Sequence, residues 1–444
     1  MITTLVGKTF LKAYNEKYNQ NYSAKEFFEK VYFELFFNHN KYLMSGGNSP
    51  FENPKISWEK MAKGLIPYET YEMHADRLKK FIFKAENTGP VLDMGIAIGY
   101  PAAENTAATS GMVSDILIES LEEDIYLSWI GGGLGIGVAG GLNLLINDPE
   151  ITLETFEGWQ FYRKYLNDPT LEKLRGNQIN SWNGQWLTYK LGKSYSEDFS
   201  FADLEQEQIF KVDTSLAEVN TVNWSNLFFS LSNRFPEGTF NAYIYSFGQT
   251  NKTIGFIPIY LKAGKKLKDI FKQLYHTEAP FDAKDFQALF GMHIKRACEL
   301  GSVGLHALRP EGLKKYMEDS KNMSFKKEEE ILIYQSYKTW LVAMLSKNKE
   351  QITDYTLELA ELIQRYRAAA KGTDRKNLVE KDLLGAKSKK GFIDALTEMV
   401  KGIDGDDLTK IKQLKDGVHL MTNEEFGYFN TLLKFDYAFV EKQS

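Results

Sequence analysis

The distribution of proline constrains this chain more than any other sequence feature. The last proline is Pro310, and none occurs from 311 to 444. Proline removes a backbone donor and clashes with the preceding helical turn, so a long proline-free stretch favours continuous helices. Apolar residues recur at helical spacing in five segments of this stretch, at 325–346, 355–371, 378–384, 391–401 and 423–440. We therefore predict an all-α helical bundle over 325–444.

The first 310 residues mix helical and strand patterns. Segment 23–37 has an N-cap serine and apolar residues at helical spacing, and 151–168 is helical and aromatic. Segment 86–150 is rich in Gly, Ala and Thr, and 176–262 has strand composition with turn residues between its runs, so we predict strands in both. The predicted class is α+β: a mixed α/β body over 1–310, a polar linker over 311–324, and the C-terminal bundle.

Charge and cysteine content narrow the function classes. The formal charge is −5, which argues against a surface wholly adapted to nucleic acid but leaves a local basic patch open. Cys298 is the only cysteine, so an intramolecular disulfide and a cysteine-rich metal site are excluded. The six histidines lie far apart, and no catalytic motif occurs. We therefore expect no metal site, no cofactor and a cytoplasmic location, since no secretory signal pattern is present.

The uncharged segment 125–146 is long enough to cross a membrane. It contains seven glycines between acidic flanks, and glycine is unfavourable inside a helix. We predict two short buried strands joined by a glycine loop, and no membrane contact. An alternative is an enzyme with a cryptic nucleotide site at the glycine-rich loop 131–141. A phosphate loop ends in Lys-Ser/Thr, whereas Leu142 and Asn143 follow here.

The segment 174–190 is the most unusual in composition. Side-chain amides alternate with tryptophan and arginine in it, at Arg175, Asn177, Gln178, Asn180, Trp182, Asn183, Gln185 and Trp186. Asparagine and glutamine read base edges, and tryptophan stacks or wedges between bases. The competing interpretation is a turn-rich hairpin whose amides bond backbone groups. Composition leaves both interpretations open.

Two basic clusters stand out in this acidic chain. One comprises Lys262, Lys265, Lys266 and Lys268, and the other comprises Arg365, Arg367, Lys371, Arg375 and Lys376. The segment 361–390 contains nine basic and four acidic residues. Such segregation is typical of a phosphate-facing stripe, but solvated helix faces give the same pattern.

These pieces together resemble a known family. The runs 140–168 and 174–192, the motif ENTGPVLDMGIAIG at 86–99 and the C-terminal 418–439 look like the large subunit of the type I CRISPR surveillance complex (Cascade), particularly subtype I-B. The resemblance covers about 86–190 and 391–440. Some members carry a cysteine cluster, which this chain lacks.

The resemblance implies a non-enzymatic subunit that reads a protospacer-adjacent motif (PAM) on duplex DNA and helps to open the duplex. It implies as partners a guide RNA (crRNA), target double-stranded DNA, the Cascade backbone subunits and a helicase-nuclease. Family members read the PAM with Asn, Gly and Lys loops and a glutamine wedge. The matching candidates here are Asn177, Gln178, Asn180, Trp182, Asn183, Gln185 and the loop Gly131, Gly132 and Gly133.

In the same family, the small subunit can arise from an internal start in the large-subunit gene. Met317 and Met323 lie where such a start would release the predicted bundle. The basic residues expected to contact nucleic-acid backbone are Arg175 and the two clusters.

Overall fold

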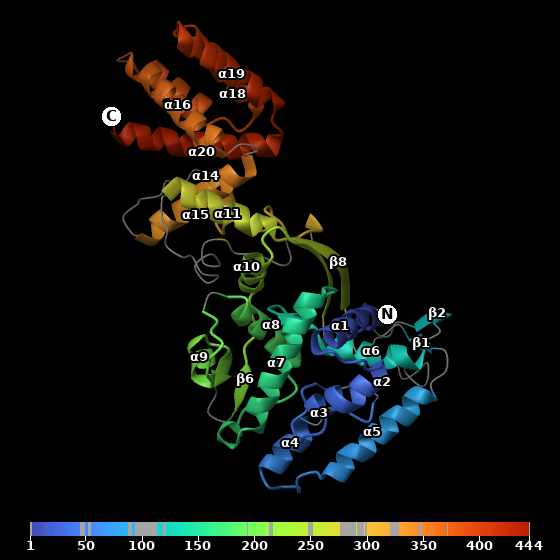
Figure 1. Ribbon diagram of the computed structural model, residues 1–444. Helices are drawn as coiled ribbons and strands as arrows, with labels where there is room; N and C mark the ends of the chain where they lie inside the picture. Colours follow the sequence, from blue (N-terminus) through green and yellow to red (C-terminus); the bar gives the residue numbers. More distant parts are fainter. Residues whose placement is uncertain are drawn as a thin grey trace. The chain divides into compact units, whose positions relative to one another are not determined.

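The computed structural model gives the fold of most of the chain (Figure 1). The described residues are 2–44, 49–51, 55–87, 91–93, 113–118, 121–192, 194–212, 216–246, 252–275, 290, 297, 300–319, 328–345, 349–370 and 372–443. Of the motif at 86–99, residues 86, 87 and 91–93 are described, and the rest lies outside the described residues. The chain forms two compact units, one mainly of residues 1–262 with 300–304, the other mainly of 263–275 and 305–444.

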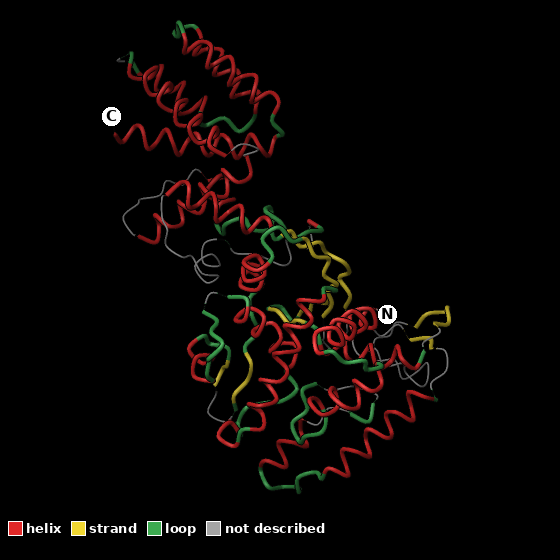
Figure 2. The backbone as a smooth tube through the Cα atoms, viewed as in Figure 1, coloured by secondary structure: helices red, strands yellow, loops and turns green. Residues whose placement is uncertain are grey.

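The predicted α+β class is confirmed: small antiparallel sheets lie in the N-terminal half, and the C-terminal region is all helical (Figure 2). The helices of the first unit are α1 Ile2–Tyr18, α2 Ala24–Phe27, η1 Phe28–Tyr32, α3 Phe33–Phe36, α4 Lys55–Ala62, α5 Tyr71–Glu86, α6 Glu122–Gly133, α7 Pro149–Asn167, η3 Pro169–Leu171, α8 Ile179–Lys190, α9 Phe201–Gln206 and α10 Trp224–Arg234. Its strands are β1 Val91–Asp93, β2 Val113–Ile118, β3 Ile136–Val138, β4 Leu142–Ile146, β5 Phe210–Val212, β6 Ala217–Val219, β7 Thr239–Ser246 and β8 Lys252–Tyr260.

The largest sheet has four antiparallel strands in the order β3-β4-β7-β8. Leu144 of the central strand β4 pairs with Ile136 on one side and Ile244 on the other. All three side chains are buried, which places this sheet in the core. The strands predicted near 240–260 are confirmed as β7 and β8. The strand composition of 176–192 and 224–234 was misleading, because these segments form α8 and α10.

The glycine-rich segment 125–146 is only half as predicted. Its second half forms β3 and β4, but its first half belongs to helix α6, so the expectation of two strands joined by a glycine loop is wrong there. In the first turn of this helix, the Asp124 carboxylate accepts a hydrogen bond from the Leu121 N–H at 3.0 Å. Gly131 faces α1, where a Cβ atom would overlap the Thr3 carbonyl oxygen. Close helix packing therefore outweighs the low helix propensity of glycine.

The N-terminal aromatic helix was predicted correctly. Ser23 caps α2: its Oγ accepts from the Glu26 N–H at 3.2 Å, and the Glu26 carboxylate accepts from the Ser23 N–H at 3.0 Å. This reciprocal pair satisfies two of the first free donors of the helix. The chain continues through η1 into α3, and Phe28, Tyr32 and Phe36 enter the core.

The second unit includes the C-terminal region, which is all helical as predicted. Its helices are α11 Lys262–Tyr275, α14 Leu313–Asp319, α15 Glu328–Leu345, α16 Lys349–Ala368, α17 Thr373–Asn377, η4 Leu378–Leu383, α18 Lys389–Val400, α19 Asp406–Leu420 and α20 Asn423–Gln443. All five predicted segments are helical, and α19 was not anticipated. Helix α14 lies within the stretch predicted as the linker 311–324, and the boundary between the two units falls earlier, after Lys262.

Among the described residues, no helix combines the length and apolar character needed to span a membrane. The suspect segment 125–146 divides between a twelve-residue helix and two short strands.

A buried carboxylate joins three helices of the second unit. Asp436 of α20 is 1 % exposed. Its Oδ1 accepts from Lys338 Nζ of α15 at 2.8 Å, and its Oδ2 accepts from Thr356 Oγ1 of α16 at 2.7 Å. A buried charge is tolerated when it is paired and hydrogen-bonded, so these helices depend on one another through this carboxylate.

We predict that Asp436→Ala lowers the free energy of unfolding by about 3 kcal/mol, because it leaves the Lys338 ammonium without its buried partner. Urea titration followed by circular dichroism measures the change. The exposed Asp394 in α18 provides the control, and Asp394→Ala should change stability by less than about 0.5 kcal/mol. Equal stability of the two variants would contradict the assignment.

Candidate functional site

The amide-rich segment forms a helix that faces the core. Trp182 and Asn183 of α8 are fully buried. The Trp182 ring stacks on Tyr162 with centroids 5.0 Å apart, and its Nε1 donates to the Gly158 carbonyl at 2.7 Å. Neither predicted interpretation of the segment, a recognition loop or a hairpin, describes its conformation. Trp182 contacts protein groups on both its ring face and its N–H.

Asn183 and Asn180 satisfy backbone groups at the end of α6. Asn183 Nδ2 donates to the carbonyls of Gly133 and Gly135 at 2.8 and 2.9 Å, and Asn180 Nδ2 donates to Gly135 at 2.9 Å. Asn183 Oδ1 accepts from Trp159 Nε1 at 3.2 Å. The last carbonyls of a helix have no partner within it, so these amides supply the missing donors. Their spacing of three residues places them on one face of α8.

The other amides also have defined places. Gln178 Oε1 accepts from the Val219 N–H, and Gln185 Nε2 donates to the Asn220 carbonyl, both at 3.0 Å. Asn177 is half-buried, has a positive φ of 60°, and donates its backbone N–H to the Tyr42 carbonyl at 2.5 Å. Asparagine tolerates this left-handed conformation better than most residues.

The glycines predicted as a recognition or phosphate loop are in α6. Gly131, Gly132 and Gly133 are buried in the last turn of this helix. A Cβ atom on Gly133 would lie 3.1 Å from the Tyr32 hydroxyl and the Phe36 ring. The expected loop at these three positions is therefore wrong, because helix packing occupies the space in front of them.

Several predicted backbone-contacting residues form ion pairs within the chain. Arg175 pairs with Glu59 at 2.8 Å and with Glu218. Lys262 pairs with Glu237 at 3.5 Å, and Lys266 donates to the Ala343 carbonyl at 2.5 Å. Lys265 and Lys268 lie on the same helix, α11, the first exposed and the second half-buried.

In the C-terminal cluster, acidic residues from outside 361–390 approach the basic ones. Arg365 pairs with Asp407 at 3.0 Å. Arg367 pairs with Glu441 at 2.6 Å and with Glu380 at 2.9 Å. Asp407 and Glu441 lie outside the window and offset its positive charge, whereas Glu380 belongs to the window itself. Arg375 donates to the Tyr366 carbonyl at 2.9 Å and lies over its ring, and Lys376 is exposed. Lys371 lies outside the described residues.

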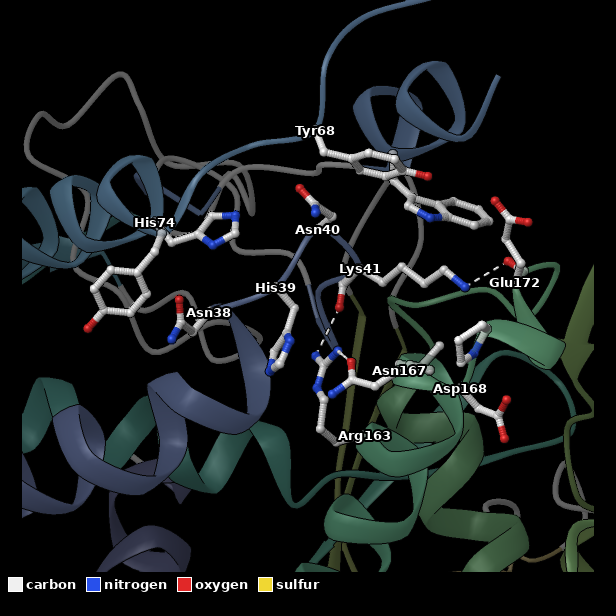
Figure 3. Close-up of a pocket in the computed structure, with 14 residues that line it drawn as sticks. Asn38, His39, Asn40, Lys41, Tyr68, His74, Arg163, Asn167, Asp168 and Glu172 are labelled. Atoms are coloured by element: carbon white, nitrogen blue, oxygen red, sulfur yellow. Dashed lines mark hydrogen bonds between the residues drawn. The ribbon is translucent and has the colours of Figure 1, made fainter. Parts of the chain in front are cut away.

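A polar pocket in the first unit was not anticipated. It has a volume of about 600 Å³ and lies between the segment after α3, the α4–α5 region and the C-terminal end of α7 (Figure 3). Its lining comprises Asn38, His39, Asn40, Lys41, Trp58, Tyr68, Tyr71, His74, Arg163, Leu166, Asn167, Asp168, Pro169 and Glu172. Distant segments supply these residues, so one local signal in the sequence points to the pocket, the polar run Asn38-His39-Asn40-Lys41 after an aromatic helix.

Arg163 is the buried centre of the pocket floor. Arg163 is only 5 % exposed. Nε donates to the Leu35 carbonyl at 2.7 Å, and Nη2 donates to the Lys41 carbonyl at 2.9 Å. Nη1 lies 3.4 Å from Asn167 Oδ1. No ion pair to a carboxylate occurs for Arg163 within the described ranges. Burial lowers its pKa to about 9, so the guanidinium stays positive at neutral pH.

Lys41 crosses the pocket and supplies a second cation. Its Nζ donates to the carbonyls of Glu172 and Leu174 at 2.7 and 2.9 Å, and lies 4.8 Å from the Trp58 ring centroid. Burial lowers the pKa of Lys41 to about 8, and the nearby Arg163 charge also lowers it, while Glu172 opposes the shift. Lys41 is therefore mostly protonated at pH 7.

The two histidines of the pocket are neutral at neutral pH. Burial, with the Arg163 charge, lowers the pKa of His39 to about 3. Burial also lowers the pKa of His74, although Glu69 opposes the shift from 3.4 Å away. Of the acids, Asp168 accepts hydrogen bonds from the N–H and hydroxyl of Thr170, which lowers its pKa. Within the described ranges, no group of His, Cys, Asp and Glu is arranged to hold a metal ion.

Two of the sequence-predicted residues lie beside this pocket. Arg175 and Asn177 line a small neighbouring cavity with Asn40, Lys41 and Trp58, and these last three residues also line the larger pocket. The other predicted residues of α8 and α6 do not line either cavity.

A scan of protein-family models, a search of curated proteins and a search of solved structures found no match to this chain.

We predict that Asn183→Ala destabilises the first unit by at least about 2 kcal/mol, because it leaves the Gly133 carbonyl and the Trp159 N–H without a hydrogen-bond partner in the core. Gln185→Ala removes one half-buried hydrogen bond and should cost about 1 kcal/mol. Thermal unfolding followed by circular dichroism ranks the two variants. A stable Asn183→Ala protein that has lost only duplex binding would instead assign this residue to DNA recognition.

Proposed function

We propose that this chain is the non-catalytic large subunit of a type I CRISPR surveillance complex of the cytoplasm. In this role it binds a guide RNA and the backbone subunits, recognises a PAM on target duplex DNA, aids duplex opening and recruits a helicase-nuclease. The sequence resemblance motivates the proposal. An α+β region followed by an all-helical region agrees with the architecture that the resemblance implies.

The observation that carries the proposal is the wall shared by the two cavities. Arg175 and Asn177 begin the amide-rich segment, and they lie beside Lys41 and Trp58 of the cationic pocket. Cations bind phosphate oxygens, and an amide reads a base edge. The wall therefore brings a backbone-binding group and a base-reading group together.

Asn177 is the base-reading residue in this proposal. The amides of Asn180, Asn183, Gln178 and Gln185 are all engaged with backbone groups of the chain. For Asn177, only the backbone N–H has a recorded partner within the described residues. Arg175 acts as a positioning residue, because Glu59 and Glu218 hold its guanidinium.

We predict that Asn177→Gly weakens binding to a PAM-containing duplex by about 5- to 150-fold, the loss of a base contact worth about 1–3 kcal/mol, with a smaller effect on a PAM-less duplex. Glycine keeps the left-handed backbone and removes only the amide. The measurement is a gel-shift titration of the complex assembled with guide RNA and the subunits encoded beside this chain, after a randomised duplex library has defined the PAM.

Asn19 offers a matched control, because it is exposed and also has a positive φ, of 51°. Asn19→Gly should leave both affinities unchanged. Equal losses on both duplexes for Asn177→Gly would exclude base reading by this residue. Failure of the chain to assemble with guide RNA and neighbouring subunits would overturn the proposed function itself.

The helical region also supports a separately made small subunit. One hydrophobic cluster, with members between Leu359 and Tyr437, lies wholly after Met323. Met317 lies within α14, and Met323 is outside the described residues. A product of 323–444 keeps this core intact, and domains fold from about 50 residues upward.

We therefore predict a second polypeptide, 323–444, in the complex purified after expression of the native gene. Intact-mass analysis detects it, and a Met323→Leu substitution should abolish it while the full-length chain remains. If the complex contains no such fragment and its composition is unchanged by the substitution, internal initiation does not occur at this site.

A further inference from the structure

The pocket around Arg163 has the chemistry of a site for a ligand with an anionic end and an aromatic end. Its volume of about 600 Å³ is within the range of small-molecule pockets, about 300–1,000 Å³. Arg163 is buried in it and Lys41 is half-buried, whereas Tyr68 and Tyr71, which also line it, are exposed. Figure 3 shows His39 beside the Arg163 guanidinium and Lys41 extending towards Glu172, with Tyr68 on the opposite wall.

The deep end is suited to a phosphate group. A guanidinium has five N–H donors, and three of those of Arg163 have acceptors on Leu35, Lys41 and Asn167. Within the described ranges, no acceptor is recorded for the other two. Because Arg163 also lacks a carboxylate partner there, its buried charge is uncompensated, and such a charge is normally paired. A bound phosphate would supply both the missing charge and the missing acceptors.

The outer end is suited to a base. Tyr68 and Tyr71 are 53 % and 62 % exposed, and both line the pocket. Stacking of a base on an aromatic ring is worth about 1–3 kcal/mol. The Asn38 side chain also lines the pocket, and its Oδ1 is a buried acceptor with no hydrogen-bond partner in the described part of the chain. Buried polar atoms seldom stay unpaired, so this acceptor is a second sign of a polar ligand.

We propose that this pocket binds a nucleoside 5′-monophosphate, with the phosphate at Arg163 and Lys41 and the base against Tyr68 and Tyr71. The ligand is either a free nucleotide or the 5′-phosphorylated end of a single strand, which share this chemistry. The site is separate from the glycines of α6, and it does not depend on the proposed role in a surveillance complex.

Isothermal titration calorimetry of the purified full-length chain tests the proposal, with adenosine 5′-monophosphate, adenosine and inorganic phosphate as probes. The monophosphate should bind more tightly than either part alone, because it engages both ends of the pocket. Lys41→Gln should weaken monophosphate binding about tenfold and leave adenosine unaffected, since it removes a charged contact. Lys164→Gln, at an exposed neighbour of Arg163 on α7, should change neither.

Tyr68→Ala provides a test that does not disturb a buried group. It should weaken the monophosphate and adenosine by about tenfold and leave inorganic phosphate unchanged. Absence of monophosphate binding at millimolar concentration overturns the site. Unchanged affinity in both Lys41→Gln and Tyr68→Ala also overturns it, and equal affinity for phosphate and monophosphate overturns the base half.

Competition distinguishes the two sources of the ligand. A short 5′-phosphorylated single strand that displaces the monophosphate, when its 5′-hydroxyl counterpart does not, identifies a strand end as the ligand. Displacement by neither strand identifies a free nucleotide. Both results support the pocket, and both are independent of whether the chain assembles with a guide RNA.

Discussion

Close approach of backbones between α6, β3 and their neighbours is the constraint on which the first unit depends. Gly131 of α6 lies against Thr3 of α1, and Gly137 of β3 lies against Gly184 of α8. A Cβ atom on Gly131 would overlap the Thr3 carbonyl oxygen, and one on Gly184 would overlap the Gly137 carbonyl oxygen. The glycines let these elements approach closely enough for large aromatic side chains to fill the rest of the core. Their cost in helix propensity is offset by this packing.

The same packing explains why the amide-rich segment is buried. Helix α6 ends inside the core, so the carbonyls of Gly133 and Gly135 need donors there. Asn180 and Asn183 provide them from the face of α8 that lies on β3. Amide side chains that resemble base readers in composition thus complete a helix end in three dimensions. At the start of the segment, Arg175 and Asn177 line the small cavity.

Arg163 links this core to the pocket. Its guanidinium holds the carbonyls of Leu35 and Lys41, so the segment after α3 is fixed against α7. Fixing that segment positions His39 and Lys41 along one wall. The pocket is therefore shaped by a buried cation whose charge is not matched by an ion-paired carboxylate in the described residues, and such an arrangement favours an anion.

Local periodicity and turn residues are enough to predict the helical C-terminal region, the capped aromatic helix at Ser23 and the strands β7 and β8. The conformations of α6 and α8 are not predicted in this way, because close packing outweighs the low helix propensity of the glycines in α6, and tertiary hydrogen bonds place the amides of α8. The tertiary structure also decides the ion pairs of the basic residues. Asp407 and Glu441 pair with Arg365 and Arg367 from outside the segment 361–390. The pocket also depends on the tertiary structure, because His39 and Lys41 are more than 100 residues from Arg163 in the sequence and meet it only in the folded chain.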